Sequence, residues 1–485
     1  MTALDNDVDT IASLQLDPEA MRALGYQVID AIVAQAISLP EQSTAQPTLD
    51  RAEMDRRMWE PAPSGPTDAI EVLGRVKSQI LATGHRNSHP RYFAYVPNPS
   101  NFVGAMGDAL AAGFNVFSGM WMGSPGAAET ELVVCDWLRS WCGLPETGGG
   151  VLLSGSSMAN MSGLVAARSA RFAGDMDAAR TGTIYYSDQA HSSVAKGARI
   201  IGIGTDRMRK IPTDANLKMS VDALREQIAA DRAAGLVPFC VIAAAGTTNT
   251  AAVDPLPEIA DICRSEHMWM HVDGAFAAAA MLTERGKKVL AGIERADSIA
   301  LDAHKWLFQP IECGVLLVRD VQTLRTTFHD RAEYLRDADT AAAEVNFCDL
   351  GPQLTREFRA LKLWMSVQTF GLDAFRAALD RTQDLAELIE QCLRESGRWE
   401  ILTPASLGVV SFKPEGVGPS GDACRSIARQ TLEEGYLALS TTEIRGETVL
   451  RMCVTNPRAT NDDIREAVRR LGLYLDRSGS ASSAE

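Results

Sequence analysis

Lys305 is the residue of this 485-residue sequence whose type and position point most directly to chemistry. It follows the apolar run 298–301 in the order Asp-Ala-His-Lys-Trp. A lysine at the end of a buried strand is energetically costly unless its charge is neutralised or used. Desolvation and nearby cations lower the pKa of a lysine and free its lone pair to form an imine with an aldehyde cofactor. Taken alone, a lysine in this position is more often an ordinary surface residue.

Two further features suit an aldehyde cofactor that carries a ring and a phosphate. Asp273 follows the run 268–272, where an acid can pair with a protonated pyridine nitrogen and keep the ring an electron sink. Residues 152–160 place glycine and serines before a helical pattern, so that backbone N–H groups and hydroxyls can converge on a phosphate. Each feature also has a simpler interpretation, Asp273 as a loop cap and the serines as a helix cap.

His191 and Thr248 complete the set of polar residues that follow apolar runs. An imidazole can stack on a planar ring and exchange protons near neutral pH. In isolation, a histidine or threonine in such a place is usually a polar group with its hydrogen bonds satisfied. Five such features in one region favour a single cofactor site, because open α/β sheets bind ligands beyond the carboxyl ends of their strands.

The elements that must position these residues are short apolar runs separated by helical patterns. This alternation predicts an α/β domain with a largely parallel sheet. A long helical pattern from residue 359 and strand-like runs at 408–413 and 448–454 then predict a smaller α+β domain. The strands predicted for the larger domain are 183–187, 239–245, 268–273, 298–301 and 314–318.

The ends of the chain differ from these domains. Asp17 can cap a helix that starts at Pro18 and repeats apolar residues on one face, and such a helix needs a partner surface. Residues 39–67 have the composition of an extended connection. The predicted division is an N-terminal helical arm and linker at 1–85, a large cofactor-binding domain at 86–353 with a mobile loop near 325–350, a small C-terminal domain at 354–476 and a disordered tail at 477–485.

Charge and cysteine content exclude several classes of protein. The 47 basic and 62 acidic residues give a net charge of −15, which repels nucleic acid and anionic membrane surfaces. Neither a signal peptide nor a run of about 18 uninterrupted apolar residues is evident, so we expect a cytoplasmic protein without a membrane partner. The nine cysteines include no CxxC pair, which predicts structural thiols without disulfides or a metal site.

Together these motifs resemble the group II pyridoxal-phosphate-dependent amino acid decarboxylases, the family of aromatic-L-amino-acid decarboxylase. The similarity begins near residues 89–95, includes 124–132 and runs to 358–364. Its most specific parts are the runs around His191, His271 and His304. The resemblance implies a fold type I, aminotransferase-like large domain with a mostly parallel seven-stranded sheet, an N-terminal helical arm and a small C-terminal α+β domain.

The resemblance also implies a role for each motif residue around pyridoxal 5'-phosphate. Lys305 is similar to the lysine that forms the Schiff base, Asp273 to the partner of the pyridinium nitrogen and His191 to the histidine stacked on the ring. Tyr334 matches a mobile-loop tyrosine that donates a proton, although an ordinary exposed aromatic residue is the simpler interpretation. The resemblance further places around the cofactor Ser156, Ser157, Thr248, His304 and Ala275.

The implied reaction is decarboxylation of an L-amino acid to the amine and CO₂, with an aromatic substrate favoured. Asn87 and Val96 stand where the animal enzymes have tryptophan and phenylalanine, and losing two rings weakens stacking. The hydroxyl of Thr355 favours phenolic side chains. The positions that the resemblance assigns to substrate binding are Tyr95, Val96, Pro97, Asn98, Trp121 and Thr355.

Several alternatives remain open at this point. The substitutions at Asn87 and Val96 leave room for histidine, glutamate or a diamino acid as substrate. An aldehyde synthase or a transaminase would keep the substrate and change the reaction, but the presence of both Tyr334 and His191 favours decarboxylation. A regulatory or storage protein without turnover is disfavoured, because the acidic N-terminal region contains no basic helix-turn-helix. The family's intertwined homodimer, with active sites at the subunit boundary, accounts for the N-terminal arm.

Overall fold

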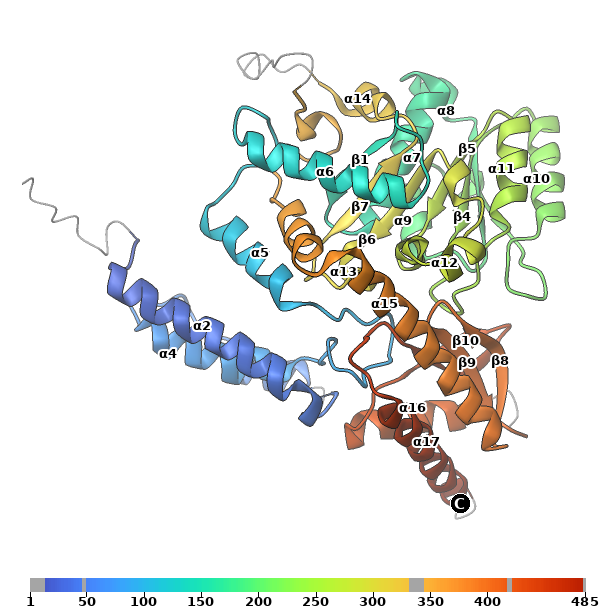
Figure 1. Cartoon of the computed structure of the whole chain (residues 1–485). Coiled ribbons are helices and arrows are strands. Elements are labelled where there is room, and N and C mark those ends of the chain that lie inside the picture. The colour runs from blue at the N-terminus through green and yellow to red at the C-terminus, as the bar shows by residue number, and fades with distance from the viewer. Residues whose placement is uncertain (1–13, 46–48, 331–343, 417–420, 483–485) are drawn as a thin grey trace, which may run out of the picture.

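A seven-stranded sheet forms the centre of the large domain (Figure 1). The computed structural model describes residues 14–45, 49–330, 344–416 and 421–482. The strand order is β1-β7-β6-β5-β4-β2-β3, and only β7 runs antiparallel to its neighbours. The expected α/β class with a mostly parallel seven-stranded sheet is therefore confirmed. The strands are β1 Gly149–Leu153, β2 Gly182–Ser187, β3 Met208–Ile211, β4 Val237–Ala244, β5 Trp269–Asp273, β6 Ser298–Asp302 and β7 Gly314–Val318.

Both faces of this sheet are covered by helices. Successive strand residues point to opposite faces: Val241 of β4 belongs to the apolar cluster that includes α10 and α11, and Ile242 to the cluster that includes α7. Burial on both faces explains why these strands are apolar throughout. The covering helices are α6 Pro125–Trp141, α7 Ser156–Phe172, α9 Ser192–Ile200, α10 Val221–Ala233, α11 Leu256–Ser265 and α14 Gln322–Phe328; shorter helices are α8 Met176–Ala179, α12 Glu284–Val289 and α13 Ala303–Trp306.

The small domain packs three helices against a four-stranded antiparallel sheet of order β10-β11-β9-β8. Its first helix, α15, contacts both domains, with α5 of the large domain on one side and β8 on the other. Gly371, at φ 74°, breaks the regular helix geometry inside α15. The elements are α5 Phe102–Gly113, α15 Ala360–Glu395, β8 Trp399–Ser406, β9 Val409–Pro414, α16 Asp422–Glu434, β10 Ser440–Ile444, β11 Glu447–Cys453 and α17 Asn461–Ser482.

The C-terminal helix corrects the prediction of a disordered tail from residue 477. Helix α17 continues to Ser482, so residues 477–482 are helical. Tertiary contacts hold this turn: Arg477 pairs with Glu434 of α16, and the hydroxyl of Ser478 lies 3.2 Å from that of Ser426. The serine-rich composition predicted disorder. Composition alone does not include the contacts with distant residues that order this turn.

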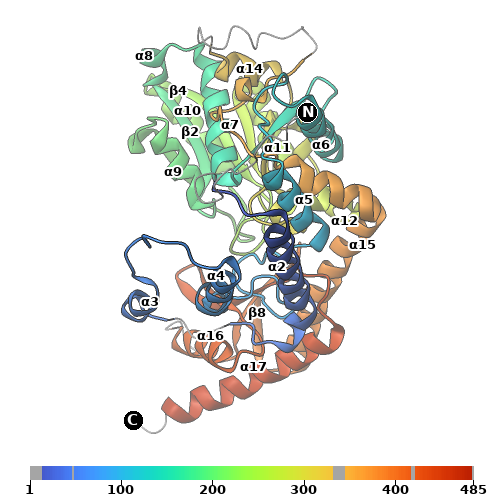
Figure 2. The same ribbon diagram turned by 90° about the vertical axis from the view of Figure 1, so that its left-hand side faces the viewer.

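The N-terminal arm stands apart from the body (Figures 1 and 2). Helix α2 Pro18–Ser38 begins as predicted, with the Asp17 carboxylate accepting the N–H groups of Glu19 and Ala20. It lies beside α4 Ala69–Arg75, and every residue of α2 is at least partly exposed. The connection that follows is not extended throughout, because Asp50 caps a further helix, α3 Arg51–Met58.

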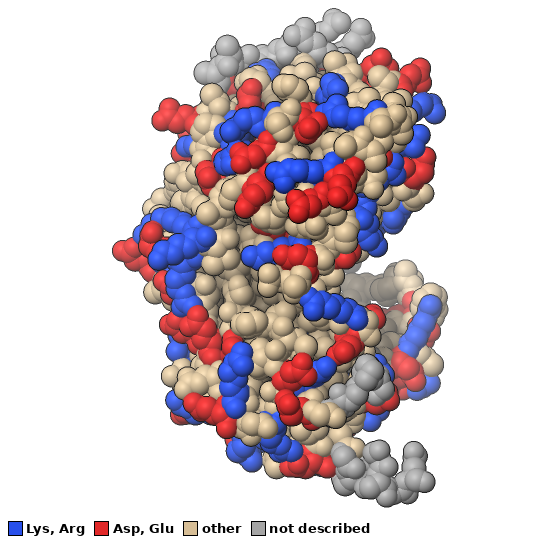
Figure 3. Space-filling model, turned by 90° about the vertical axis from the view of Figure 1, so that its right-hand side faces the viewer, with Lys and Arg blue, Asp and Glu red and all other residues tan. Residues whose placement is uncertain are grey.

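One helix of the described residues, Pro18–Glu41, is long and apolar enough by length and composition to cross a membrane. The search for an uninterrupted apolar run missed it, because scattered polar residues interrupt a segment whose average is apolar. Elsewhere the surface is strongly charged, and Figure 3 shows basic and acidic side chains intermixed over one face.

The described cysteines behave as the sequence predicts. All nine are free thiols, and seven of them are buried. Burial raises the pKa of the Cys142 thiol to about 12, so this sulfur stays protonated and acts as a small apolar group. Within the described ranges, no three His, Cys, Asp or Glu side chains form a group that could hold a metal ion.

Candidate active site

The carboxyl ends of β1, β2, β4, β5 and β6 meet at a cavity of about 300 Å³. The five strands run in the same direction, so the residues that follow them converge on one edge of the sheet. The structure thus brings together most of the residues selected from the sequence. Those that line the cavity are Lys305, Asp273, His191, Ser156, Ser157, Thr248, His304, Ala275 and Val96.

Lys305 is held in place by a carboxylate that sequence reasoning did not select. Its Nζ lies 3.0 Å from Oδ2 of Asp302, whose side chain is 4% exposed. The other oxygen of Asp302 accepts the backbone N–H of Ser156 at 2.7 Å. Asp302 therefore links the end of β6 to the start of α7 beneath the cavity. The only signal was an acid three residues before the lysine: Asp302 ends β6 and caps the short helix α13 that carries Lys305.

His304 adds a second buried group beside this ion pair. Its Nδ1 accepts the backbone N–H of Cys313 at 3.1 Å, and its Nε2 lies 3.8 Å from Asp302. Burial lowers the pKa of His304 below its usual value, which favours the neutral ring. The predicted substrate residue Asn98 reaches the same segment, because its amide donates to the carbonyl of His304 at 3.0 Å.

Asp273 ends β5 with its side chain largely buried. One carboxylate oxygen accepts the N–H of Ala275 at 3.2 Å, and the other accepts the side-chain amide of Asn160 at 3.0 Å. His191 follows β2 and caps α9, and its Nδ1 lies 2.8 Å from Oγ of Ser193. Asn160 also donates to Ser193 at 3.0 Å. Two side chains that the sequence did not single out therefore connect Asp273 with His191.

Behind Asp273, His271 is fully buried in the sheet. Its two ring nitrogens lie 2.7 Å from Oγ of Ser298 and 2.9 Å from Oδ1 of Asn160. Burial lowers the pKa of His271 to about 3. The ring is therefore neutral at physiological pH, with one nitrogen that donates and one that accepts.

The depressed pKa of His271 makes the stability of the fold depend on pH. Between pH 6.5 and 3 the unfolded histidine binds a proton that the folded one does not, so stability falls as pH is lowered through this range. We expect a loss of up to about 1.4 kcal/mol per pH unit from this residue. Thermal unfolding at pH 7 and pH 5 should show a weaker pH dependence in His271→Gln than in the unchanged chain. The same change at exposed His267 is the control, and an equal pH dependence in all three proteins would contradict the expectation.

The start of α7 has the form of an anion site. Gly155, at φ 99°, caps the helix in a conformation that favours glycine. The hydroxyl of the next residue, Ser156, is buried at the cavity and has no hydrogen-bond partner in the part of the chain that the structure describes. A helix N-terminus with a free hydroxyl suits a phosphate. The sequence selected both serines but did not distinguish the buried one.

Five of the six residues that the sequence assigned to substrate binding, Asn98 among them, do not line the cavity in the described structure. Tyr95 is 69% exposed, Thr355 is exposed, and Trp121 packs against the apolar cluster beneath α7 and α14. Pro97 turns its carbonyl to Thr455. Sequence proximity to Val96, which does line the cavity, therefore did not determine which side chains face it.

The other side chains that line the cavity include Phe276, Ile311 and Glu312, which sequence reasoning missed. Phe276 stacks on Trp306 with ring centroids 4.8 Å apart. Glu312 pairs with Arg359 at 2.8 Å. The only signal for them was proximity to Asp273 and Lys305. Tyr334 lies outside the described residues.

Comparisons with known proteins agree with this geometry. The family model of the pyridoxal-dependent decarboxylase conserved domain matches residues 53–415. An aromatic-L-amino-acid decarboxylase of Bacillus atrophaeus is 41% identical, with 95% of this chain and 96% of the relative covered. A phenylacetaldehyde synthase of Arabidopsis thaliana is 32% identical, with 93% and 95% covered. The crystal structure of Oryza sativa TDC with PLP and tryptamine superposes with a TM-score of 0.90 at 28% identity, covering 95% of this chain and 99% of that one.

Proposed function

Since this chain belongs to the pyridoxal-dependent decarboxylase family, we propose that it converts an aromatic L-amino acid to the corresponding amine and CO₂. Its cofactor is pyridoxal 5'-phosphate. The observation that carries the proposal is the meeting of Lys305, Asp273 and His191 in one cavity at the strand ends. The choice of an aromatic substrate rests on the relatives, whose names include an aromatic-L-amino-acid decarboxylase and a tyrosine decarboxylase.

The residues of the cavity fit this cofactor. The unpartnered hydroxyl of Ser156 and the N-terminus of α7 suit the phosphate. The amine of Lys305 suits the aldehyde, and the carboxylate of Asp273 suits a protonated ring nitrogen. Thr248, Ala275 and the other lining residues supply the remaining walls.

When bound, pyridoxal 5'-phosphate supplies a sink for the electron pair that remains at Cα as CO₂ leaves. Asp273, held by two hydrogen bonds, would keep a proton on the ring nitrogen of the bound cofactor. Asp302 orients the amine of Lys305. Val96 and Phe276 give the cavity apolar walls, and loss of water from it would strengthen the electrostatic interactions inside.

Return of a proton to Cα completes the reaction. We assign this proton to His191, whose imidazole lines the cavity. Tyr334 is the second proton donor in this proposal, on the strength of the sequence resemblance. A chain that lacked an effective proton donor would form an aldehyde instead of the amine. The identity of the product therefore tests the proposed function.

The test is mass-spectrometric product analysis of the purified, cofactor-loaded protein. The panel contains tyrosine, DOPA, phenylalanine and tryptophan beside histidine, glutamate and 2,4-diaminobutyrate. Amine and CO₂ from an aromatic substrate support the proposal, and amine only from the other acids overturns the substrate class. The second candidate, an aldehyde synthase, has the Arabidopsis thaliana relative in its favour. It would be revealed by an aldehyde formed with hydrogen peroxide.

The phosphate assignment makes a separate prediction for Ser156. Changing it to alanine removes one hydrogen bond to a charged group, which is worth about 1.5–3 kcal/mol. We expect the dissociation constant of pyridoxal 5'-phosphate to rise by roughly 10- to 100-fold, as measured by fluorescence titration. Ser162→Ala is the matched control, because this serine is also buried in α7 without a hydrogen-bond partner among the described residues but does not line the cavity. An unchanged affinity of Ser156→Ala for pyridoxal 5'-phosphate would contradict the assignment of the phosphate to this position.

The N-terminal arm supports a homodimer. A groove of about 1210 Å³ runs between α2 and the body, from Val28 and Ile32 to Phe370 and Phe375. Exposed apolar surface on a lone helix marks an interaction site, and we propose that a second copy of the chain covers it. The groove extends to the active-site cavity, because Ile311 lines both.

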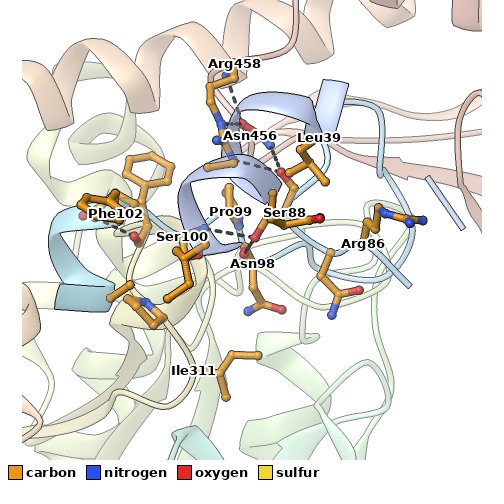
Figure 4. Close-up of a pocket in the computed structure, with 18 of the residues that line it drawn as sticks. Leu39, Arg86, Ser88, Asn98, Pro99, Ser100, Phe102, Ile311, Asn456 and Arg458 are labelled. Carbon is orange, nitrogen blue, oxygen red and sulfur yellow. Dashed lines mark hydrogen bonds between the residues drawn. The ribbon is translucent and has the colours of Figure 1, made fainter. Parts of the chain in front are cut away.

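Figure 4 shows the polar floor of this groove. Asn456 and Arg458 both donate to the carbonyl of Ser88, at 2.9 and 3.0 Å, and the hydroxyl of Ser88 donates to the carbonyl of Asn98. Asn98 also donates to the carbonyl of His304 in the active site. A partner bound in the groove would therefore contact a residue that is hydrogen-bonded to the active site.

The dimer and a cytoplasmic location are tested together. Light scattering should give twice the 52.3 kDa chain mass, and a protein from which residues 1–45 have been removed should lose dimer and activity together. Flotation of the full chain with lipid vesicles tests the alternative that the apolar helix binds a membrane instead of a second copy of the chain. Monomeric protein that floats with the vesicles would overturn both the dimer and the location.

A further inference from the structure

A run of buried hydrogen bonds begins at Trp269 and leads toward the active site. The indole Nε1 of Trp269 donates to Oγ of Ser298 at 2.8 Å. Ser298 lies 2.7 Å from Nδ1 of His271, and Nε2 of that ring lies 2.9 Å from Oδ1 of Asn160. Ser298, His271 and Asn160 are at most 1% exposed. None of these four side chains lines the cavity in the described structure.

Two groups set the direction of these bonds: the indole of Trp269, which only donates, and the carboxylate of Asp273, which accepts. An indole nitrogen only donates, so Ser298 accepts from Trp269 and has its own hydrogen free for Nδ1 of His271. The neutral ring of His271 then carries its single hydrogen on Nε2. That hydrogen is donated to Asn160, whose Oδ1 is the acceptor.

The direction continues through Asn160 to the two groups at the cavity. Because Oδ1 of Asn160 accepts from His271, its amide nitrogen carries two hydrogens for Oδ2 of Asp273 and Oγ of Ser193, both at 3.0 Å. Ser193 thus accepts from Asn160 and gives its own hydrogen to Nδ1 of His191 at 2.8 Å. The backbone N–H of Ser193 also points to this nitrogen at 3.3 Å.

The opposite direction of these hydrogen bonds would place two acceptors against each other. If the ring of His271 carried its hydrogen on Nδ1, Nε2 would need a donor and the amide of Asn160 would turn round. The amide oxygen would then face the carboxylate of Asp273, with two acceptors 3.0 Å apart in a buried place. A buried acceptor without a donor is costly, so only the direction from Trp269 to the cavity satisfies every group.

We propose that Asn160 is a positioning residue that holds Asp273 and His191 as one unit and presents His191 to the cavity with its hydrogen on Nε2. This inference rests on the proposed function, because it concerns two residues assigned to the decarboxylation. Nδ1 of His191 is occupied as an acceptor, so proton exchange with the cavity takes place through Nε2. Asp273 and His191, which are 82 positions apart in the sequence, thereby share one support.

The first test reads the hydrogen positions directly. In the full-length protein labelled with ¹⁵N-histidine, with and without pyridoxal 5'-phosphate, we expect His191 and His271 to show the Nε2–H form. His191→Gln and His271→Gln identify the two signals among the seven histidines. In Ser193→Ala only the longer backbone N–H contact of 3.3 Å still reaches Nδ1 of His191, so the share of its Nδ1–H form should rise while His271 stays unchanged. A hydrogen on Nδ1 of His191 in the unchanged protein, or an unchanged His191 in Ser193→Ala, would overturn the proposal.

The second test asks whether the unit matters for turnover. Asn160→Ala should lower kcat by roughly tenfold or more with little change in KM, and should shift the pH profile of kcat. The matched control is Ser162→Ala, which alters a buried hydroxyl of the same helix that the structure leaves unpartnered among the described residues. The control should keep both histidine signals and kcat. Equal losses in both variants, or an unchanged pH profile in Asn160→Ala, would mean a merely structural role.

The outcome for this proposal is distinct from that for the proposed function. If the chain formed no amine from any substrate, the ¹⁵N signals would still report whether His191 and His271 carry their hydrogens on Nε2. If amine formed but the signals showed Nδ1–H, the function would stand and the support by Asn160 would fall.

Discussion

Changing Lys305 to alanine should reduce amine formation by at least roughly 10³-fold, because the variant lacks the nucleophile that exchanges the cofactor with substrate. Asp302, 3.0 Å from the amine, cannot replace it, since a carboxylate forms no imine. The defect should lie in kcat rather than in folding, because the Lys305 side chain is 24% exposed and stands at the cavity. Product analysis by mass spectrometry measures the loss.

A chemical readout separates this effect from a general loss of structure. Borohydride treatment of the cofactor-loaded protein should attach the cofactor to the peptide that contains Lys305, and no such adduct should form in the variant. The exposed Lys288 of α12 offers a matched control, whose alanine variant should keep both adduct and activity. Full activity in Lys305→Ala, or an adduct on another lysine, would refute the assignment.

Changing Glu131 to glutamine should destabilise the fold by about 3–5 kcal/mol, because it leaves the guanidinium of Arg356 buried without its counter-charge. The two side chains are 0% and 1% exposed. The pair also holds both backbone groups of Leu152 in β1: its N–H donates to Glu131 at 2.8 Å, and its carbonyl accepts from Arg356 at 2.7 Å. The loss should therefore reach the start of α7, which follows β1. Chemical unfolding followed by circular dichroism measures it.

An ion pair on the same helix whose carboxylate is exposed is the control for this prediction. In α6, Arg139 pairs with Asp136, whose side chain is 63% exposed. Asp136→Asn should cost no more than about 1 kcal/mol, since solvent screens exposed ion pairs. Removing both charges of the buried pair, in Glu131→Gln with Arg356→Met, should cost less than the sum of the two single changes. A loss in Glu131→Gln as small as that in Asp136→Asn would contradict the expectation.

The strand-end pattern was enough to find the centre of the site. Lys305, Asp273 and His191 each follow an apolar run whose local composition predicts a strand. Because parallel strands end at one edge, correct prediction of the strands also predicted that these residues meet. The edges of the sheet were harder. Strands β1 and β3 were not predicted, since β1 begins with two glycines and β3 carries two basic residues.

The residues that support the site could not be found in this way. Asn160 is an ordinary polar residue in an amphipathic helix, and its partners His271 and Asp273 lie more than 110 positions further along the chain. The pairing of Arg356 with Glu131 spans 225 positions. Local patterns report which residue types lie next to each other in the sequence, whereas these contacts depend on how α7 and α6 pack on the sheet.

The residues themselves thus determined the α/β class, the N-terminal helix with its Asp17 cap, and the group Lys305, Asp273 and His191, because each depends on local periodicity or on a strand end. Packing decided the rest. It turned Tyr95 outward, buried the hydroxyl of Ser156 at the cavity, placed Asp302 against Lys305 and joined Asp273 to His191 through Asn160. Each of these outcomes depends on distances between elements far apart in the chain, and no local pattern of side chains encodes such distances.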